Sequence, residues 1–203
     1  MAKAPVVGRV KTRLCPPCDA AQAAAIAQAA LEDTLQAALL CGHPVVLALD
    51  GPRGDWLPAG IEVIAQQGLS FNERLASAWL HLADGGVQVG MDTPQITPQL
   101  LDDAVRAVSD SGAAFGPATD GGWWLLGLAR PEPTAFEAIA MSASDTGARQ
   151  LERLRVLGYH PTILPTLTDI DTWATAVEVG ALAAGSRTAR AVDRVSLTIT
   201  GAR

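Results

Sequence analysis

The stretch Val87-Gln88-Val89-Gly90-Met91-Asp92-Thr93-Pro94 decides the fold class of this chain. It begins as a short apolar run, typical of a buried strand, and stops at a carboxylate and a Thr-Pro turn. Thr97-Pro98 then predicts a helix start, because threonine caps helices and proline fits the first turn. An aspartate between such a strand and helix lies at the sheet edge where open α/β proteins bind ligands. From this stretch alone, an Asx-turn at Asp92 is an equal alternative.

Strands and helices alternate on both sides of this stretch. Apolar runs predict strands at 44–50, 61–65, 87–90, 112–117, 125–128 and 161–164. Helical spacing and caps predict helices at 19–41, 70–83, 98–111, 144–157 and 168–184. This alternation predicts an α/β protein, a single-domain three-layer α/β/α sandwich over residues 1–203 with a mostly parallel sheet. In the tail at 185–203, Val195–Thr200 alternates with period two and is interpreted as an edge strand.

Composition narrows the function classes. The 203 residues are 49% hydrophobic, enough for one sizeable core, and the net charge of −6 argues against a nucleic-acid partner. No run of eighteen apolar residues occurs, so we expect no membrane partner. Four cations, Lys3, Arg9, Lys11 and Arg13, interrupt the N-terminal segment, which predicts no signal peptide and a cytoplasmic location.

The three cysteines invite a redox or zinc interpretation. Cys15-Pro16-Pro17-Cys18 has the CxxC spacing, but one such pair supplies only two ligands. Cys41 lies at the end of a predicted helix, far along the chain. We interpret all three as incidental.

A basic loop, Pro5 to Leu14, predicts phosphate binding. After Gly8, the cations Arg9, Lys11 and Arg13 fall within five positions. Backbone N–H groups of such a loop can cradle phosphates while Lys and Arg neutralise them. The loop is not a Walker A motif, because the Gly-Lys-Thr order is absent. For the loop taken alone, a solvated basic turn is the simpler alternative.

The stretch Asp120-Gly121-Gly122-Trp123-Trp124 is also unusual. Two glycines after an aspartate allow positive φ and close approach of a ligand to the backbone. Adjacent tryptophans on an extended segment face opposite sides. One is expected in the core, which leaves the other to stack on a base or sugar. A tight turn with two packing tryptophans is the alternative.

Acidic residues follow several predicted strands and converge, with the basic loop, on one sheet edge. They are Asp50, Asp92, Asp120, Asp169 and Asp171. Like charges this close repel, so the set is best explained by a hard divalent cation and a polyphosphate. Oxygen ligands suit Mg²⁺ or Mn²⁺.

Four segments in order carry a resemblance to a known family. They are Ala2-Lys3-Ala4-Pro5 with Gly8 to Leu14, Gly90 to Pro98, Gly116 to Gly127, and Asp169-Ile170-Asp171-Thr172. Together they resemble the DUF2064 family of GT-A-fold, nucleotide-diphospho-sugar-transferase-like proteins, over about residues 2–180. The Lys-Thr-Arg-Leu and Asp-x-Asp-Thr elements are also similar to phospholactate guanylyltransferase and molybdopterin nucleotidyltransferases.

The resemblance implies phosphate contacts for Lys11 and Arg13, a metal site for Asp92 and Asp171, and the acceptor side for Asp120 with Gly121 and Gly122. From the patterns above we also assign nucleotide binding to Gly8, Arg9 and Asp50 and the acceptor side to Trp123. The expected catalytic residues are Asp120 and Lys11. One departure stands out. Relatives place a full apolar strand before Ala2, and here that strand is absent, so either the start is truncated or another segment, such as Val195–Thr200, fills the gap.

Three functions follow as alternatives. The first is a metal-dependent transferase that moves a sugar from a nucleotide-sugar to a small-molecule acceptor. The second is a nucleotidyltransferase that joins a nucleoside monophosphate to a phosphorylated small molecule, and the third is a non-catalytic nucleotide-binding protein. The sequence does not identify the base and sugar of the donor or the acceptor. It also leaves open whether the protein forms a homodimer.

Overall fold

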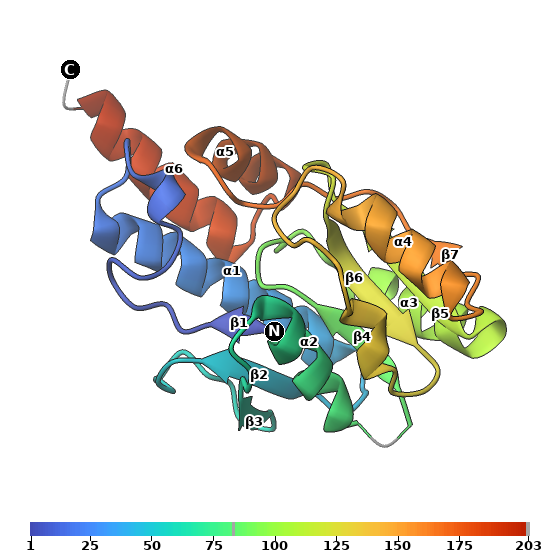
Figure 1. Cartoon of the computed structure of the whole chain (residues 1–203). Coiled ribbons are helices and arrows are strands. Elements are labelled where there is room, and N and C mark those ends of the chain that lie inside the picture. Colours follow the sequence, from blue (N-terminus) through green and yellow to red (C-terminus); the bar gives the residue numbers. More distant parts are fainter. Residues whose placement is uncertain (83, 202–203) are drawn as a thin grey trace. The chain divides into compact units, whose positions relative to one another are not determined.

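The structure, a computed structural model, describes residues 1–82 and 84–201 (Figure 1). The chain forms two compact units built from interleaved segments. Unit 1 contains Met1, Ile64–Gly90 and Gln99–Leu167. Unit 2 contains Ala2–Val63, Met91–Pro98 and the chain from Thr168 onward.

A four-stranded sheet forms the centre of unit 1. Its strands are β4 (Gly86–Val89), β5 (Ala113–Pro117), β6 (Trp123–Leu128) and β7 (Thr162–Ile163), in the order β4-β6-β5-β7. Strand β6 pairs antiparallel with both β4 and β5, and β7 pairs parallel with β5. Three strands therefore run in one direction, as predicted, and β6 runs in the other. The reversal follows from the short connection 118–122, which is long enough for a hairpin but not for a parallel crossover.

One face of this sheet carries most of the unit's aromatic core. Phe115 and Leu126 lie opposite each other in the register and pack with Trp79 and Leu154. These partners come from α2 (Phe71–Leu80) and α4 (Thr146–Val156), with the short η2 helix (Pro133–Phe136) in the same cluster.

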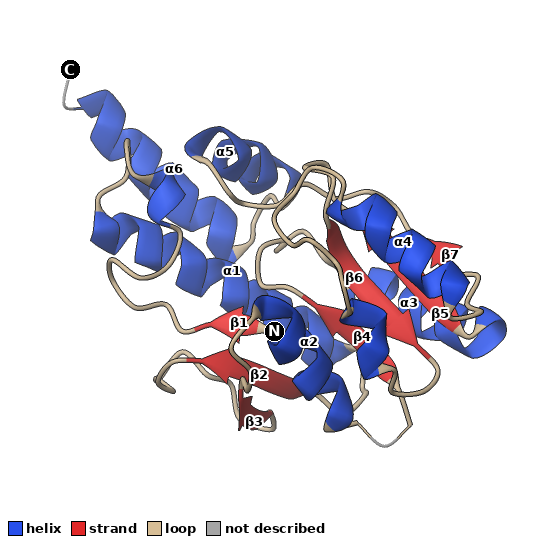
Figure 2. Ribbon diagram, in the orientation of Figure 1, coloured by secondary structure: helices blue, strands red, loops and turns tan. Residues whose placement is uncertain are grey.

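The other face is covered by α3 (Pro98–Ser111). A Cβ added to Gly127 would lie 2.5 Å from Val108 of α3, so the missing side chain lets the helix pack closely on β6. Helices thus cover both faces of this sheet, and the predicted α/β class with its layered arrangement is confirmed (Figure 2).

Unit 2 contains the remaining strands. Strand β1 (Ala2–Lys3) runs parallel to β2 (Val46–Asp50), and β3 (Glu62–Ala65), which crosses the unit boundary, follows in the order β1-β2-β3. The sequence analysis predicts no strand at these two residues, so β1 was missed. Two residues suffice, because Ala2 is buried and pairs with Leu49 at the end of a longer strand.

Three helices and one short helix complete unit 2. They are α1 (Ala20–Leu40), α5 (Trp173–Leu182), α6 (Arg187–Gly201) and η1 (Thr12–Leu14). Helices α1 and α6 lie side by side (Figure 2), and Ile26 of α1 packs in one cluster with Val192 and Val195 of α6.

The predicted edge strand at Val195–Thr200 is wrong, because this segment lies within α6. Alternation over six residues fits a strand, but Val192, Val195 and Ile199 also recur at helical spacing, and all three face the unit 2 core. That segment therefore does not replace a strand.

Helix starts follow the predicted capping residues. Asp19 caps α1 and Ser70 caps α2, each in a reciprocal capping box with the residue three positions later. The predicted end of α2 near residue 83 lies outside the described residues, and the helix ends at Leu80. Within residues 1–82 and 84–201, no helix is long and apolar enough to cross a membrane.

Candidate functional site

The basic loop is held in place by its apolar residues. Val10 and Leu14 are buried in the two core clusters of unit 2, which leaves the intervening positions near the surface. Lys11 adopts a left-handed backbone conformation, with φ 49°, directly before η1. This turn changes the chain direction between the two anchors and places Lys11 and Arg13 on the same loop.

Asp92 lies in the loop that leaves β4. Its neighbours Met91 and Thr93 are both buried, so the loop is anchored on either side of the carboxylate. Met91 Sδ accepts a hydrogen bond from the backbone N–H of Lys3 at 3.3 Å, which ties this loop to β1.

Asp171 is positioned in a similar way. Ile170 is fully buried in the cluster with Leu14, and Thr172 caps α5. The backbone N–H of Asp171 donates to Thr175 Oγ1 at 3.0 Å, which fixes the residue at the start of the helix. Asp169, the other predicted acidic residue here, is half-buried.

Two ion pairs bring the basic and acidic loops together. Lys11 Nζ lies 2.6 Å from Asp92 Oδ1, and Arg13 Nη1 pairs with Asp171 Oδ2. Ile170 connects the two pairs: its carbonyl accepts from Lys11 Nζ, and its N–H donates to the Asp92 carbonyl at 2.8 Å. The structure therefore joins four of the predicted site residues into one charged cluster within unit 2.

Burial differs sharply within this charged cluster. The Lys11 side chain is 10% exposed and that of Asp92 44%, whereas the Arg13 side chain is 74% exposed. Two cations balance two anions, so the carboxylate repulsion expected from the sequence is relieved by Lys11 and Arg13 themselves. An anionic ligand at this cluster would meet an exposed guanidinium fork and an ammonium fixed by protein contacts.

The carboxylate oxygens of Asp92 and Asp171 are the type of ligand that a hard divalent cation prefers. Each ion pair uses one carboxylate oxygen, and in the described residues Asp92 Oδ2 and Asp171 Oδ1 have no further partner. In the Asp92 loop, the buried Thr93 Oγ1 and Gln95 Oε1 also lack partners. No group of three or more His, Cys, Asp or Glu arranged for a metal occurs among the described residues. Two carboxylates completed by water and substrate phosphates are a usual Mg²⁺ environment.

The other predicted nucleotide-binding residues are also in unit 2. Gly8 has φ 76° with open space around it, and Arg9 is exposed. Asp50 ends β2, where its carbonyl accepts from the Ala4 N–H at 2.8 Å. Among the described residues, no hydrogen bond or ion pair joins Gly8 or Arg9 to the charged cluster, so their assignment rests on the loop they share with Lys11.

Asp120 and the glycine pair belong to unit 1 and form a tight turn. Asp120 Oδ1 accepts from the Gly122 N–H at 2.8 Å, which is an Asx-turn. A Cβ on Gly121, where φ is +87°, would lie 1.9 Å from the Ser144 carbonyl, and one on Gly147 would lie 2.6 Å from the Gly122 carbonyl. The glycines are needed here because the turn packs directly against the start of α4.

The two tryptophans of this stretch differ in burial. Trp124 is buried, and its Nε1 donates to the Pro165 carbonyl at 3.0 Å. Trp123 is half-buried, with its ring centroid 6.3 Å from that of Phe136. Trp123 is thus supported on one side by the unit 1 core.

One residue that connects the acidic loops was missed from the sequence. Gln95 Nε2 donates to the Thr168 carbonyl at 2.7 Å, which links the Asp92 loop to the segment before Asp169. No local pattern identifies Gln95, because its partner is distant in the sequence.

The fold is that of nucleotide-diphospho-sugar transferases. A crystal structure described as a "putative nucleotide-diphospho-sugar transferase" from Desulfovibrio desulfuricans G20 is 27% identical, with a TM-score of 0.85 over 98% of this chain and 94% of that chain. The family model "Uncharacterized protein conserved in bacteria (DUF2064)" matches residues 22–143, and the chain belongs to this family. The resemblance inferred from the motifs is confirmed, although Lys11, Arg13 and Asp171 lie outside the matched range.

Two mycobacterial structures are more distant. The Rv0371c homolog from Mycobacterium sp. strain JC1 and Rv0371c from Mycobacterium tuberculosis H37Rv are each 20% identical to this chain. Their TM-scores are 0.49 and 0.47, over 75% and 88% of this chain and 82% and 94% of their own. No curated protein matches the chain.

Proposed function

We propose that this protein is a transferase that uses a nucleotide-activated donor and transfers a sugar from a nucleotide-sugar to a small-molecule acceptor. The observation that carries the proposal is the charged cluster of Lys11, Arg13, Asp92 and Asp171, joined through Ile170. The likeness to the Desulfovibrio structure supports the class of donor.

In this proposal Lys11 and Arg13 bind the donor diphosphate. Arg13 is exposed and presents a planar fork that matches phosphate oxygens. Lys11 is held by two protein contacts, so its charge stays in one place while negative charge develops on the leaving diphosphate. Lys11 is therefore the proposed catalytic cation, and Arg13 positions the nucleotide.

Asp92 and Asp171 are the residues that would hold Mg²⁺ or Mn²⁺. When bound, such an ion supplies charge neutralisation for the diphosphate. The oxygens that each carboxylate leaves outside its ion pair are the proposed ligands, because hard oxygen donors suit these ions.

Asp120 is the proposed general base. Its Oδ1 is held by the Gly122 N–H, which orients the carboxylate and leaves Oδ2 to accept the proton of an acceptor hydroxyl. The glycine turn and the half-buried Trp123 are proposed to line the acceptor side.

The test is a product analysis with a panel of nucleotide-sugars and nucleoside triphosphates, with Mn²⁺, Mg²⁺ or EDTA. Nucleoside diphosphate released from a nucleotide-sugar supports glycosyl transfer. Pyrophosphate released from a triphosphate in the presence of sugar phosphates would favour nucleotidyl transfer instead, the alternative that the Lys11–Arg13 loop also suits. Binding of nucleotides in calorimetry without either product would indicate a non-catalytic protein.

The matched variants are Asp171→Asn and Asp103→Asn. Both aspartates are half-exposed and paired with an exposed arginine, Arg13 and Arg106 respectively, but only Asp171 belongs to the charged cluster. Loss of product with Asp171→Asn and its retention with Asp103→Asn are expected. Equal activity of the two variants would contradict the proposed site.

A further inference from the structure

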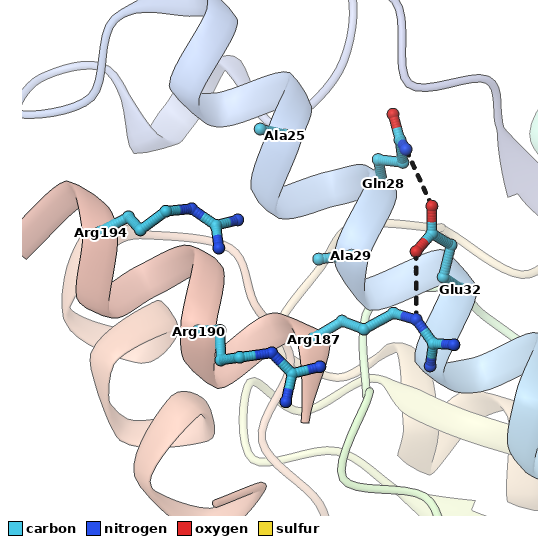
Figure 3. Close-up of a pocket in the computed structure, with 7 residues that line it drawn as sticks. All are labelled: Ala25, Gln28, Ala29, Glu32, Arg187, Arg190 and Arg194. Atoms are coloured by element: carbon cyan, nitrogen blue, oxygen red, sulfur yellow. Dashed lines mark hydrogen bonds and ion pairs between the residues drawn. The ribbon is translucent and has the colours of Figure 1, made fainter. Parts of the chain in front are cut away.

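A pocket of about 310 Å³ lies between α1 and α6 (Figure 3), and no residue of the charged cluster lines it. Ala25 and Ala29 of α1 form its small-residue floor. Because alanine side chains are short, they leave space between two helices that otherwise pack closely. The volume is at the lower end of the range for small-molecule sites, about 300–1,000 Å³.

Three arginines line the α6 side of this pocket. Arg187, Arg190 and Arg194 are spaced three and four positions apart, which places them on one face of the helix. Figure 3 shows their side chains in a row opposite the α1 residues. In a chain of net charge −6, this is a local concentration of positive charge.

Arg187 is already neutralised. Its Nε lies 3.3 Å from Glu32 Oε2 and its Nη1 lies 3.4 Å from Asp33 Oδ1. The second oxygen of Glu32 accepts from Gln28 Nε2 at 2.8 Å, so this carboxylate is fully used (Figure 3). Neither acidic group is therefore available to the other two arginines.

Arg190 and Arg194 have no carboxylate partner in the described part of the chain. Arg190 Nη1 donates to the Gly185 carbonyl at 2.6 Å, which orients the guanidinium without neutralising it. Arg194 is exposed and makes no ion pair or hydrogen bond with the described residues. Like charges at this helical spacing repel, and an anion between them would remove the repulsion.

The arginines of α3 and α4 differ from Arg190 and Arg194. All arginines of α3 and α4 pair with a carboxylate: Arg106, Arg149, Arg153 and Arg155. If the arginines of α6 only formed a solvated basic face, we would expect them to pair with carboxylates as well, because the protein is acidic. The two unpaired arginines instead border the α1–α6 pocket.

We infer that the α1–α6 pocket binds the dianionic phosphate of a small phosphate ester. Two guanidinium forks match the paired oxygens of a phosphate group. The pocket extends past these forks to the Gln28 amide, which can hydrogen-bond a hydroxyl-bearing body. This site is separate from the proposed donor site and does not depend on the proposed transferase activity.

The test is calorimetric titration of the protein with ribose 5-phosphate and with inorganic phosphate, at an ionic strength kept constant with chloride. The Arg194→Gln variant should weaken ribose 5-phosphate binding at least tenfold. Because Arg194 makes no bond to the described residues, its loss should leave folding unchanged. Arg190→Gln should weaken binding similarly, but it also removes the bond to Gly185, so Arg194→Gln is the decisive variant.

One control locates the binding. The Arg149→Gln variant loses an equal charge on α4 and should bind ribose 5-phosphate like wild type. Unchanged affinity with Arg194→Gln, or equal weakening with Arg149→Gln, would overturn the site. Equal affinity for inorganic phosphate and ribose 5-phosphate would overturn the ester assignment. A dimer that Arg194→Gln dissociates, without phosphate binding, would make this face a protein interface and the inference wrong.

Discussion

Lys11 Nζ lies 2.6 Å from Asp92 Oδ1, and this pair joins the N-terminal loop to the loop after β4. The ammonium is nearly buried and also donates to the Ile170 carbonyl. From the sequence alone, a cation in a basic loop is expected to contribute little to stability. The contact instead gives Lys11 a structural role beside its proposed role in binding.

Lys11→Met should destabilise the protein. The substitution keeps the aliphatic length but leaves Asp92 and the Ile170 carbonyl without their partner, at a cost of about 1–3 kcal/mol. Urea unfolding measures the change as a lower midpoint at constant m. The control is Arg106→Met, which removes a cation from an exposed pair on α3 and should change stability by no more than ~0.5 kcal/mol. An unchanged midpoint for Lys11→Met would mean that the buried pair contributes nothing.

Asp171→Asn should reduce nucleotide binding while leaving the free energy of unfolding nearly unchanged. Its partner Arg13 is exposed, so losing the pair should cost within ~0.5 kcal/mol. If Asp171 is a metal ligand, the variant should nevertheless lose Mn²⁺-dependent nucleotide binding in calorimetry. Asp92→Asn should lose the same binding but also unfold more easily, because Lys11 then loses its carboxylate partner.

The double variant Asp92→Asn, Asp171→Asn checks whether both residues serve one ion. If they do, it should bind nucleotide little worse than either single variant. Additive losses would point to two independent contacts, and wild-type binding by both single variants would remove the metal site altogether.

Gly121→Ala should prevent normal folding of unit 1. The new Cβ would lie 1.9 Å from the Ser144 carbonyl, and the backbone has φ +87°. We expect a loss of more than about 4 kcal/mol, or insoluble protein. Gly112→Ala is the matched control, since Gly112 has φ +80° but open space around it. It should cost only about 1–2 kcal/mol for the left-handed conformation. Similar losses for both would show that the close approach to Ser144 is unimportant.

Cys18 should react slowly with iodoacetamide in the folded protein. Burial, followed by the nearby Cys15 and Asp19, raises the pKa of the Cys18 thiol from 9.0 to about 11. Since only the thiolate is a nucleophile, its rate should rise about tenfold per pH unit from pH 8 toward pH 11. A Cys15→Ala, Cys41→Ala variant isolates this thiol, and the urea-unfolded chain, with its pKa near 9, is the reference.

The raised pKa of the Cys18 thiol also predicts how the stability of the folded protein depends on pH. The folded state favours the neutral thiol, so the Cys18 contribution should be complete below pH 9 and be lost as the pH rises through about 11. Cys18→Ala should remove this part of the alkaline dependence. A Cys18 rate that levels off near pH 9 would contradict both statements.

Local signals in the sequence predict most of the elements. The capping boxes at Asp19 and Ser70 identify two helix starts because cap and partner are only three residues apart. The edge strand predicted at Val195–Thr200 is wrong because six alternating residues fit both the strand period and the helix period. Only a wider window, which begins at Ala191, shows that the buried residues recur at helical spacing. Strand β1 was missed because pairing with β2, not its own two residues, makes Ala2–Lys3 a strand.

The sequence identifies the members of the charged cluster but not the contacts between them. Motif residues identify Lys11, Arg13, Asp92 and Asp171 as one group, and the structure joins them. Which cation pairs with which carboxylate depends on how distant loops pack, and no local pattern encodes that. For the same reason the partner of Gln95 and the unpaired arginines of α6 have no signature in the sequence.

Ile170 has a consequence for the thermodynamics of ligand association. It is fully buried, its carbonyl accepts from Lys11, and its N–H donates to the Asp92 carbonyl, so one residue fastens three loops. The conformational entropy of these loops is therefore lost during folding, before any ligand arrives. Association at this cluster needs little further ordering of the backbone, and a ligand that fits the preorganised loops keeps more of its interaction energy as affinity.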